Sequence, residues 1–455
     1  MTAESGSWVH MVGVGGAGMS GIARVLREQG VRVSGSDLNT DGITSQLEKI
    51  GVTIYHGHFA SNLQEGVDLV VISSAIPADN VEVAAARAMN TPVIKRGQML
   101  ARMANLHLGL AVAGAHGKTT TTSMLYSALV GCGLDPTMIL GGEIQGTQLH
   151  ARLGGNDYFI LEADESDGSF LELKPYAAIV TNIENDHLDF YRSMDKLQAA
   201  FRRFLGQIMP TGFAMVYGGD PLLRHMREDL PGRILTYGES DDMDYYFNNW
   251  VPEGMGSSFE VYRGKERLGL ARLAIPGKHN ALNALAAAAV AVEIGQDFGL
   301  AAKALQAFPG AKRRFQIIAR TKGITIVDDY AHHPTEIIAT IRAARQFHQD
   351  RLAVIFQPHR YSRTQLLYQQ FGEAFREADL VIITDIYSAG ETPIENVTGE
   401  LIYQAAVAAG CEAVYIPGLD DAEDFLQNTL QSNDLLVTMG AGDVWKTGVR
   451  LAEKL

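Results

Sequence analysis

The sequence has only two cysteines, Cys132 and Cys411, among its 455 residues. Two cysteines cannot build a disulfide framework or a zinc site made of thiolates, so small disulfide-stabilised folds and zinc ribbons are excluded. Both side chains are therefore expected to be small buried hydrophobic groups.

Long apolar runs and a surplus of positive charge are also missing. The longest apolar run, residues 281–294, is too short and too rich in alanine to span a bilayer, so we expect a packed helix there and no contact with a membrane. The first residues lack a basic flank followed by an apolar core, which indicates no signal peptide and a cytoplasmic protein. The net charge of −14 argues against a nucleic-acid surface but leaves small anionic ligands possible.

The first hundred residues alternate between strand and helix patterns. Short apolar segments at 8–12, 31–34, 67–73 and 92–94 predict strands, and the spacing in 19–29 predicts a helix. Because the strands are almost continuously apolar, both faces of their sheet should be buried, which is typical of a parallel sheet.

A similar alternation starts twice more along the chain. The second region has predicted strands at 108–113, 158–161 and 177–181, a polar and aromatic stretch at 238–273 that suggests a small antiparallel element, and a long helix at 277–295. The third region has predicted parallel strands, separated by helices, at 325–327, 352–356, 380–384 and 435–439.

These patterns predict an α/β protein of three domains. Residues 1–106 should form an N-terminal Rossmann-like domain, 107–312 a central domain like that of P-loop ATPases, and 313–455 a C-terminal Rossmann-like domain.

A first glycine-rich loop, Gly-Val-Gly-Gly-Ala-Gly, occupies residues 13–18 between the first strand and the first helix. Asp37 follows about twenty residues later, at the end of the second strand, where dinucleotide-binding folds carry an acidic partner. Glycines in such a loop let backbone N–H groups approach a diphosphate, and the helix N-terminus favours the negative charge. The motif indicates a diphosphate, whether from NAD, FAD or another nucleotide.

A second loop, Gly-Ala-His-Gly-Lys-Thr-Thr, occupies residues 114–120, again between a strand and a helix. Val112 stands where a strict phosphate-binding loop has its first glycine, but the Gly-Lys-Thr core is kept. Lys118 can reach the β and γ phosphates, and the Thr119 hydroxyl can bind Mg²⁺. Two such loops in one chain suggest one nucleotide as substrate and another as the energy source.

Acidic residues follow two central strands. Residues 162–167 (Glu-Ala-Asp-Glu-Ser-Asp) come after the strand at 158–161, and residues 182–189, which include Glu184 and His187, come after the next one. Since ligands of a parallel sheet bind at the carboxyl ends of its strands, both clusters should lie near Lys118. Carboxylates and an imidazole there suit Mg²⁺ bound to phosphate.

Several segments together resemble the Mur ligase family. The resemblance covers nearly the whole chain and is carried, in order, by residues 13–21, 35–37, 73–76, 96–99, 114–120, 162–170, 181–189, 277–283, 313–315, 328–334, 357–364, 385–391 and 440–443. The most specific are Glu-Ala-Asp-Glu-Ser-Asp-Gly-Ser-Phe at 162–170, Asp-Asp-Tyr-Ala-His-His-Pro at 328–334 and Gln-Pro-His-Arg-Tyr-Ser-Arg-Thr at 357–364.

The resemblance implies a ligase that uses ATP and Mg²⁺ and has UDP-N-acetylmuramate and L-alanine as substrates, with no nucleic-acid or membrane partner, as a monomer or homodimer. The first domain would bind the UDP-sugar, the central domain ATP, and the third domain would close over ATP and bring the amino-acid site.

The resemblance also implies roles for individual residues. ATP would be contacted by Gly114, His116, Gly117, Lys118, Thr119, Thr120, His279, Asn280, Asn283, Arg313 and Asp328. Mg²⁺ would be held by Thr119, Glu162 and His187. The UDP-sugar would be contacted by Gly15, Gly16, Ala17, Gly18, Met19, Ser20, Asp37, Ser73, Ser74 and Arg96, and the amino acid by His332, Arg360 and Arg363. The catalytic groups would be Lys118, Glu162, His187, Arg313 and His359.

The sequence departs from the family pattern at three places. His150 stands where asparagine is usual, Ala115 where threonine is usual, and Ala331 where glycine is usual. Three alternatives stay open: another ligase of the same fold, such as one that recycles a whole tripeptide, an NAD-dependent oxidoreductase, or a non-catalytic nucleotide-binding regulator. The base that deprotonates the attacking amine is also open among His332, His333 and His359.

Overall fold

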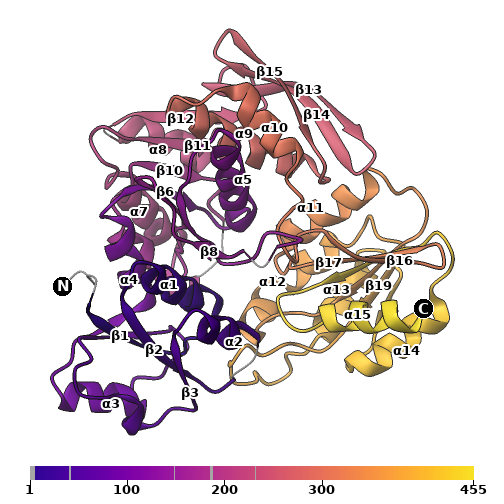
Figure 1. Cartoon of the computed structure of the whole chain (residues 1–455). Helices are drawn as coiled ribbons and strands as arrows, with labels where there is room; N and C mark the ends of the chain where they lie inside the picture. Colours follow the sequence, from indigo (N-terminus) through magenta and orange to yellow (C-terminus); the bar gives the residue numbers. More distant parts are fainter. Residues whose placement is uncertain (1–5, 40–41, 148, 185–187, 231) are drawn as a thin grey trace. The chain divides into compact units, whose positions relative to one another are not determined.

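The α/β prediction is confirmed by the computed structural model, which describes residues 6–39, 42–147, 149–184, 188–230 and 232–455. Within these residues the strands form three sheets of five, ten and six strands (Figure 1). The chain divides into two compact units. Unit 1 contains the residues up to Asn248 with Glu260–Ala271 and Leu282–Leu305, and unit 2 contains Asn249–Phe259, Arg272–Ala281 and Gln306–Leu455.

The five-stranded sheet of unit 1 is entirely parallel, as predicted, with the strand order β3-β2-β1-β4-β5. Its strands are β1 (Trp8–Val12), β2 (Arg32–Asp37), β3 (Thr53–His56), β4 (Leu69–Ile72) and β5 (Val93–Lys95). Its helices are α1 (Ala17–Glu28), α2 (Gly42–Lys49), η1 (Ala60–Asn62), α3 (Val81–Ala88) and α4 (Arg96–Ala104). Alternate side chains of β1 enter different cores: Val9 and Met11 pack with α1, whereas Trp8 and Val12 pack with α3.

The ten-stranded sheet has the order β15-β14-β13-β12-β11-β10-β6-β9-β7-β8. Its strands are β6 (Leu108–Ala113), β7 (Thr137–Ile139), β8 (Ala151–Arg152), β9 (Tyr158–Glu162), β10 (Ala177–Val180), β11 (Phe213–Tyr217), β12 (Ile234–Gly238), β13 (Tyr245–Glu253), β14 (Gly256–Arg263) and β15 (Glu266–Leu273). The accompanying helices are α5 (Lys118–Gly131), η2 (Ser169–Glu172), α6 (Leu188–Tyr191), α7 (Met194–Leu205), α8 (Pro221–Asp229), α9 (Lys278–Glu293) and α10 (Phe298–Gln306). The strands β13–β15 are joined by tight turns and form the small element expected at 238–273 (Figure 1).

The six-stranded sheet of unit 2 has the order β16-β17-β21-β18-β19-β20. Its strands are β16 (Gln316–Thr321), β17 (Ile324–Asp329), β18 (Leu352–Phe356), β19 (Leu380–Ile383), β20 (Ala413–Tyr415) and β21 (Leu435–Met439). The four predicted strands are β17, β18, β19 and β21, and they pair in parallel with one another and with β20. The sequence patterns did not predict β16, which pairs with β17 as an antiparallel edge strand.

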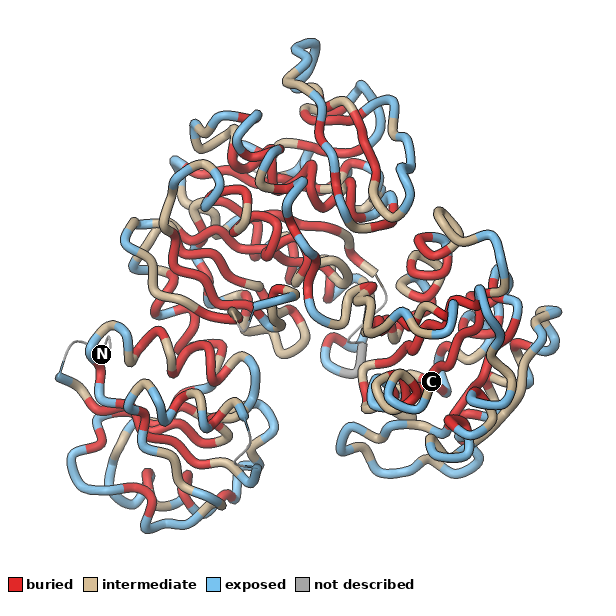
Figure 2. Tube along the Cα trace, turned by 45° about the vertical axis from the view of Figure 1, so that its right-hand side comes forward, coloured by how far each residue is buried: buried red, intermediate tan, exposed pale blue. Residues whose placement is uncertain are grey.

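Five helices cover the two faces of this sheet. They are α11 (Pro334–Arg345), α12 (Tyr361–Ala374), α13 (Glu400–Ala408), α14 (Leu419–Thr429) and α15 (Trp445–Lys454). The first three pack on the face that carries Val354 and Val437, and the last two pack on the face that carries Ile355 and Leu436. Burial follows this layering, since buried residues run along the strands and exposed ones gather in loops (Figure 2).

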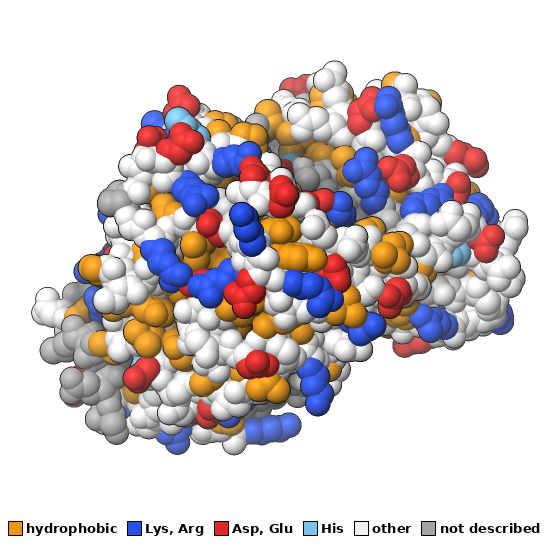
Figure 3. All heavy atoms as spheres, turned by 90° about the horizontal axis from the view of Figure 1, so that it is seen from above, with side chains coloured by type: hydrophobic (Ala, Val, Ile, Leu, Met, Phe, Trp, Pro, Cys, Tyr) orange, Lys and Arg blue, Asp and Glu red, His pale blue; other side chains and the backbone are white. Residues whose placement is uncertain are grey.

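The surface features agree only in part with the composition. Cys132 and Cys411 are both partly exposed, so the expectation that they are buried is wrong. Each lies just after a helix or a turn, where the chain reaches the surface. No helix of the described residues is long and apolar enough to cross a membrane. On the face in Figure 3, Lys and Arg side chains are interspersed with Asp and Glu.

Candidate active site

The first glycine-rich loop is shaped by the end of β2. The N–H groups of Gly13 and Val14 donate to the Ser36 carbonyl oxygen at 2.8 and 3.1 Å. The Gly15 N–H donates to Asp37 Oδ2 at 2.8 Å. Gly13 has a φ of +79°, which a residue with a side chain rarely adopts. Asp37 therefore fixes the shape of the predicted diphosphate loop in this structure.

Ser73 and Arg96 also lie beside this loop. A Cβ on Gly13 would lie 3.0 Å from the Ser73 Cβ, and a Cβ on Gly18 would lie 2.9 Å from Arg96 Nη1. Ser74, the next residue along, is exposed. The structure thus brings the predicted UDP-sugar residues from the ends of four strands, β1, β2, β4 and β5, to one edge of the sheet.

Met19 and Ser20 belong to the same predicted set, but their side chains are buried in the core. The Ser20 hydroxyl donates to the Ala17 carbonyl oxygen at 3.0 Å and lies 3.3 Å from His150 Nε2. His150, one of the departures from the family pattern, is thereby a buried packing partner of α1. Any contribution of Met19 and Ser20 to a ligand is through their backbone.

The second glycine-rich loop is held by the residues after β10. Thr181 Oγ1 and Asn182 Nδ2 donate to the His116 carbonyl oxygen at 2.6 and 3.1 Å, and the His116 N–H donates to Asn182 Oδ1 at 2.9 Å. Gly114 has a φ of +129°, and a Cβ there would lie 2.2 Å from Thr181 Oγ1. Only glycine therefore fits at this position.

Lys118 opens α5, and its ammonium group is fully engaged. Nζ donates to the carbonyl oxygens of Gly114 at 2.5 Å and Ala115 at 3.3 Å, and it lies 2.7 and 3.0 Å from the two carboxylate oxygens of Glu165. Burial alone would lower the pKa of Lys118, but the carboxylates of Glu165 and Asp164 raise the pKa above its usual value. The lysine is therefore a fixed positive charge beside the loop.

Two of the three predicted metal ligands lie together. The Thr119 hydroxyl donates to Glu162 Oε2 at 3.1 Å, and the other carboxylate oxygen of Glu162 accepts the Gly141 N–H at 2.7 Å. Two adjacent hard oxygen ligands fit a magnesium ion. The third predicted ligand, His187, lies outside the described residues.

The loop also meets α9 and the residues after β10. A Cβ on Gly117 would lie 3.1 Å from Asn283 Oδ1. Asn283, a predicted ATP residue on α9, therefore lies beside the loop. His116 Nε2 lies 3.3 Å from Glu184 Oε2. The Thr120 side chain, in contrast, is buried in α5.

In unit 2, the partly exposed Arg313 forms an ion pair with the buried Asp328. Arg313 Nε donates to Asp328 Oδ2 at 2.9 Å, while its two terminal nitrogens donate to the carbonyl oxygens of Gly442 and Gly440 at 3.2 and 2.7 Å. Thr438 donates to the other Asp328 oxygen at 2.7 Å. Burial raises the pKa of Asp328 above its usual value, although Arg313 and Thr438 oppose this. Both predicted ATP residues therefore stabilise the loop after β21.

The predicted amino-acid residues of unit 2 form an aromatic and cationic cluster. The His332 ring lies 5.7 Å from the His359 ring, which stacks on Tyr387 at 5.8 Å. Arg363 Nη1 lies 3.4 Å from His359 Nδ1, and Arg360, with a φ of +71°, caps the start of α12. The structure thus brings together His332, His359 and the Arg363 guanidinium, which could bind a carboxylate.

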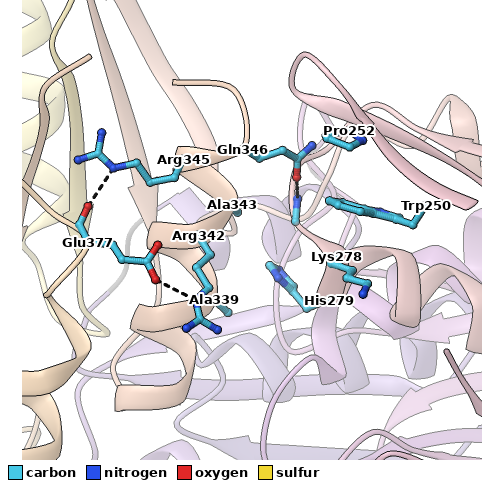
Figure 4. A pocket seen from close by; sticks show the side chains of 11 residues that line it. Trp250, Pro252, Lys278, His279, Ala339, Arg342, Ala343, Arg345, Gln346 and Glu377 are labelled. Carbon is cyan, nitrogen blue, oxygen red and sulfur yellow. Dashed lines mark hydrogen bonds and ion pairs between the residues drawn. The ribbon is translucent and has the colours of Figure 1, made fainter. Parts of the chain in front are cut away.

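His279 and Asn280 lie at the start of α9. The Asn280 side chain is buried and donates to the Pro276 carbonyl oxygen at 2.7 Å, whereas His279 is exposed. His279 lines a cavity of about 480 Å³ with Trp250, Lys278 and residues of α11 (Figure 4).

The sequence predicted that the acidic cluster at 162–167 lies near Lys118, but it assigned no role to two of its residues, Asp164 and Glu165. Asp164 pairs with Arg96 at 3.0 Å, and Glu165 pairs with Lys118. Burial alone would raise the pKa of Asp164, but Lys118 and Arg96 hold it below its usual value. The signal for both was their place directly after β9, at the ligand edge of the sheet.

The chain is similar to known proteins along nearly its whole length. Three family models match in succession: "Mur ligase family, catalytic domain" at residues 8–107, "Mur ligase middle domain" at 112–291 and "Mur ligase, glutamate ligase domain" at 313–442. Among curated proteins, the UDP-N-acetylmuramate--L-alanine ligase of Syntrophomonas wolfei is 57% identical, with 100% of this chain and 98% of that protein covered. The ligase of the same name from Desulforamulus reducens is 47% identical, with 98% and 97% covered.

Solved structures agree with these matches. The UDP-N-acetylmuramate-alanine ligase MurC of Thermotoga maritima has a TM-score of 0.83 and 30% identity, with 98% of both chains covered. A murein peptide ligase of Psychrobacter arcticus has a TM-score of 0.73 and 27% identity, also with 98% of both chains covered.

Proposed function

The chain belongs to the Mur ligase family, and from this we propose that it joins L-alanine to the carboxylate of UDP-N-acetylmuramate, with ATP converted to ADP and phosphate. The reaction makes UDP-N-acetylmuramoyl-L-alanine for peptidoglycan. The observation that carries the proposal is the second glycine-rich loop, where Lys118 and the adjacent Thr119 and Glu162 lie at one edge of the central sheet. Full-length similarity to ligases that carry these two substrates in their names supports the choice of substrates.

The chemistry requires an activated carboxylate, because a free carboxylate would have to expel oxide when an amine attacks. The carboxylate oxygen takes the γ-phosphoryl group of ATP, so the bond from phosphorus to the β,γ-bridging oxygen breaks and ADP leaves. The amine of L-alanine then attacks the acyl phosphate. A C–N bond forms, the amine loses a proton and phosphate departs.

Positive charge is needed where the phosphoryl group transfers. Lys118 supplies it in unit 1, and we assign Arg313 the same role in unit 2. Thr119, Glu162 and His187 would hold Mg²⁺, which neutralises phosphate charge when bound. The predicted ATP residues Gly114, His116, Gly117, Thr120, His279, Asn280, Asn283 and Asp328 complete this proposed set.

The amino acid would be held by the cluster in unit 2. Arg360 and Arg363 each present a planar guanidinium group that can bind the alanine carboxylate through two hydrogen bonds. His359 lies beside Arg363, and His332 lies beside His359; both histidines are candidates for the group that accepts the amine proton. The UDP-sugar would be held by Gly15, Gly16, Ala17, Gly18, Asp37, Ser73, Ser74 and Arg96, with the backbone of Met19 and Ser20.

Domain boundaries near residues 106 and 312, a cytoplasmic location and a monomeric or homodimeric state belong to the same proposal. An acyl phosphate hydrolyses in water, so the proposal includes closure of the C-terminal domain during the reaction.

The decisive experiment measures ADP release with UDP-N-acetylmuramate, ATP and Mg²⁺ while amino acids and the murein tripeptide are added one at a time. We expect L-alanine to give the fastest release and a product larger by one alanine residue. Preference for the tripeptide would favour a recycling ligase instead. Oxidation or reduction of NAD, without ADP release, would favour an oxidoreductase.

A further inference from the structure

The ammonium group of Lys118 has three N–H donors, and the structure shows where they are directed. Two carbonyl oxygens of its own loop, those of Gly114 and Ala115, accept on one side. The Glu165 carboxylate faces the ammonium with both oxygens at 2.7 and 3.0 Å. The two carbonyl oxygens belong to the glycine-rich loop that carries Lys118, so they cannot be displaced without changing the loop. A phosphate can therefore accept a hydrogen bond from Lys118 only in the direction that Glu165 occupies.

Glu165 is built into this position. Its side chain is 2% exposed, and its carbonyl oxygen accepts the Tyr191 hydroxyl at 2.6 Å. The two neighbouring carboxylates are directed elsewhere, because Glu162 accepts from Thr119 and Gly141, and Asp164 pairs with Arg96. Among these three carboxylates at the end of β9 and just after it, Glu165 is the one in contact with Lys118.

We propose that Glu165 is a positioning residue that takes the place of a nucleotide phosphate on Lys118 when no nucleotide is bound. Nucleotide binding then includes displacement of this carboxylate from the lysine. The inference rests on the proposed role of Lys118 as the phosphate-binding lysine. It predicts a gain in affinity when the carboxylate is neutralised, whereas a purely structural residue would give a loss.

The test is nucleotide binding to the full chain, measured by titration calorimetry. Glu165→Gln keeps the size of the side chain but replaces the charged partner of Lys118 by a neutral amide. We expect the Kd for ADP to fall about tenfold, because the ion pair with Lys118 in the free protein is exchanged for a weaker hydrogen bond from the ammonium to a neutral amide. The Kd for AMP should not change, since Lys118 serves the β and γ phosphates.

Glu172→Gln is the matched control, because Glu172 follows in the same segment but is exposed. It should leave the Kd for ADP unchanged. In a Lys118→Ala background, Glu165→Gln should no longer tighten ADP binding, since the effect operates through the lysine. If circular dichroism shows that Glu165→Gln reduces the folded fraction, Glu165→Asp replaces it as the test. This variant keeps the negative charge on a shorter side chain, further from Lys118, and should give a smaller gain in ADP affinity.

An unchanged or raised Kd for ADP in folded Glu165→Gln protein would overturn the inference. Binding and ligation are separate measurements, so the two proposals fail in different ways. If the variant still forms the alanine product without tighter ADP binding, only the inference about Glu165 is lost. If the wild-type chain binds no adenine nucleotide, the proposed function is lost as well.

Discussion

Arg363 is the residue whose contacts most directly suggest recognition of the alanine carboxylate. It lies on α12 with its guanidinium 3.4 Å from His359. Arg363→Ala should raise the KM for L-alanine at least tenfold and leave the KM for ATP nearly unchanged, because one charge-assisted contact to the amino acid is removed. Steady-state kinetics with each substrate varied in turn would show this.

Arg376→Ala provides the comparison, since Arg376 follows α12 but is exposed and paired with Glu373. It should leave both constants unaltered. Equal increases in the two KM values for Arg363→Ala would count against a carboxylate contact.

Asp329 gives a pH-dependent term in the stability of unit 2. Burial raises its pKa to about 6, although Arg314 and the N–H groups of Ala331 and Phe315 favour the charged form. Its pKa is thus higher in the folded state than in the unfolded state. The associated stability is present below about pH 4 and is lost as the pH rises through 6.

Urea unfolding between pH 4 and pH 7 checks this term. Across that range, the free energy of unfolding of the wild-type chain should fall by on the order of 3 kcal/mol relative to that of Asp329→Asn. Asp379 provides a comparison of opposite sign. Burial alone would raise its pKa, but the Leu352 N–H and Arg345 hold it below its usual value, so its contribution is lost as the pH falls. An identical pH profile for Asp329→Asn and wild type would contradict the assignment.

Gln346, directly after α11, connects the start of β14 with the residue before α9, all within unit 2. Its Oε1 accepts the Gly277 N–H at 2.9 Å (Figure 4). Its Nε2 donates to the Gly256 carbonyl oxygen at 2.7 Å. Gln346→Ala should lower the free energy of unfolding by about 2 kcal/mol, because it leaves two backbone groups without these partners. Gln349→Ala, which removes only an exposed bond to the Arg345 carbonyl oxygen, should have little effect. A difference of less than about 0.5 kcal/mol between the two variants would show that the bridge is not stabilising.

The elements that the sequence predicted best are the central strands. The bounds of β1, β6, β18 and β21 match the predicted ranges, because each is a mostly apolar run that is buried on both faces. The edge strands β3, β16 and β20 were missed because none of their residues is fully buried, so their patterns do not stand out. Which strands become neighbours is decided by tertiary packing, which no local pattern encodes.

The same limit applies to the candidate site. The glycine-rich loops and Lys118 were predictable because their residue types and spacing are set by local backbone geometry. The pairing of Glu165 with Lys118 and of Asp164 with Arg96 depends on β9 lying next to β6 and on α4 packing against η2. A Cβ on Gly97 would lie 2.2 Å from that of Ser169, and this close approach is visible only in three dimensions.

Considered as a whole, the chain carries two proposed nucleotide sites with different electrostatic demands. The first loop offers backbone N–H groups and Arg96 to a diphosphate, whereas the second places Lys118 among the carboxylates of Glu162, Asp164 and Glu165. Asp164 is paired with Arg96, but Glu162 and Glu165 together carry more negative charge than Lys118 alone can neutralise, and phosphates brought to the second loop would face it. The second site should therefore depend on a divalent cation, and the first should not.

Removal of the metal tests this contrast on the intact chain. Excess EDTA should abolish ADP formation, and Mg²⁺ added beyond the chelator should restore it. Binding of UDP-N-acetylmuramate, followed by calorimetry under the same two conditions, should change less than about twofold, because backbone donors and a guanidinium hold the diphosphate without a metal. ADP formation that continues undiminished in EDTA would refute the assignment of Thr119 and Glu162 as metal ligands. Loss of UDP-sugar binding in EDTA would instead place a cation at the first loop.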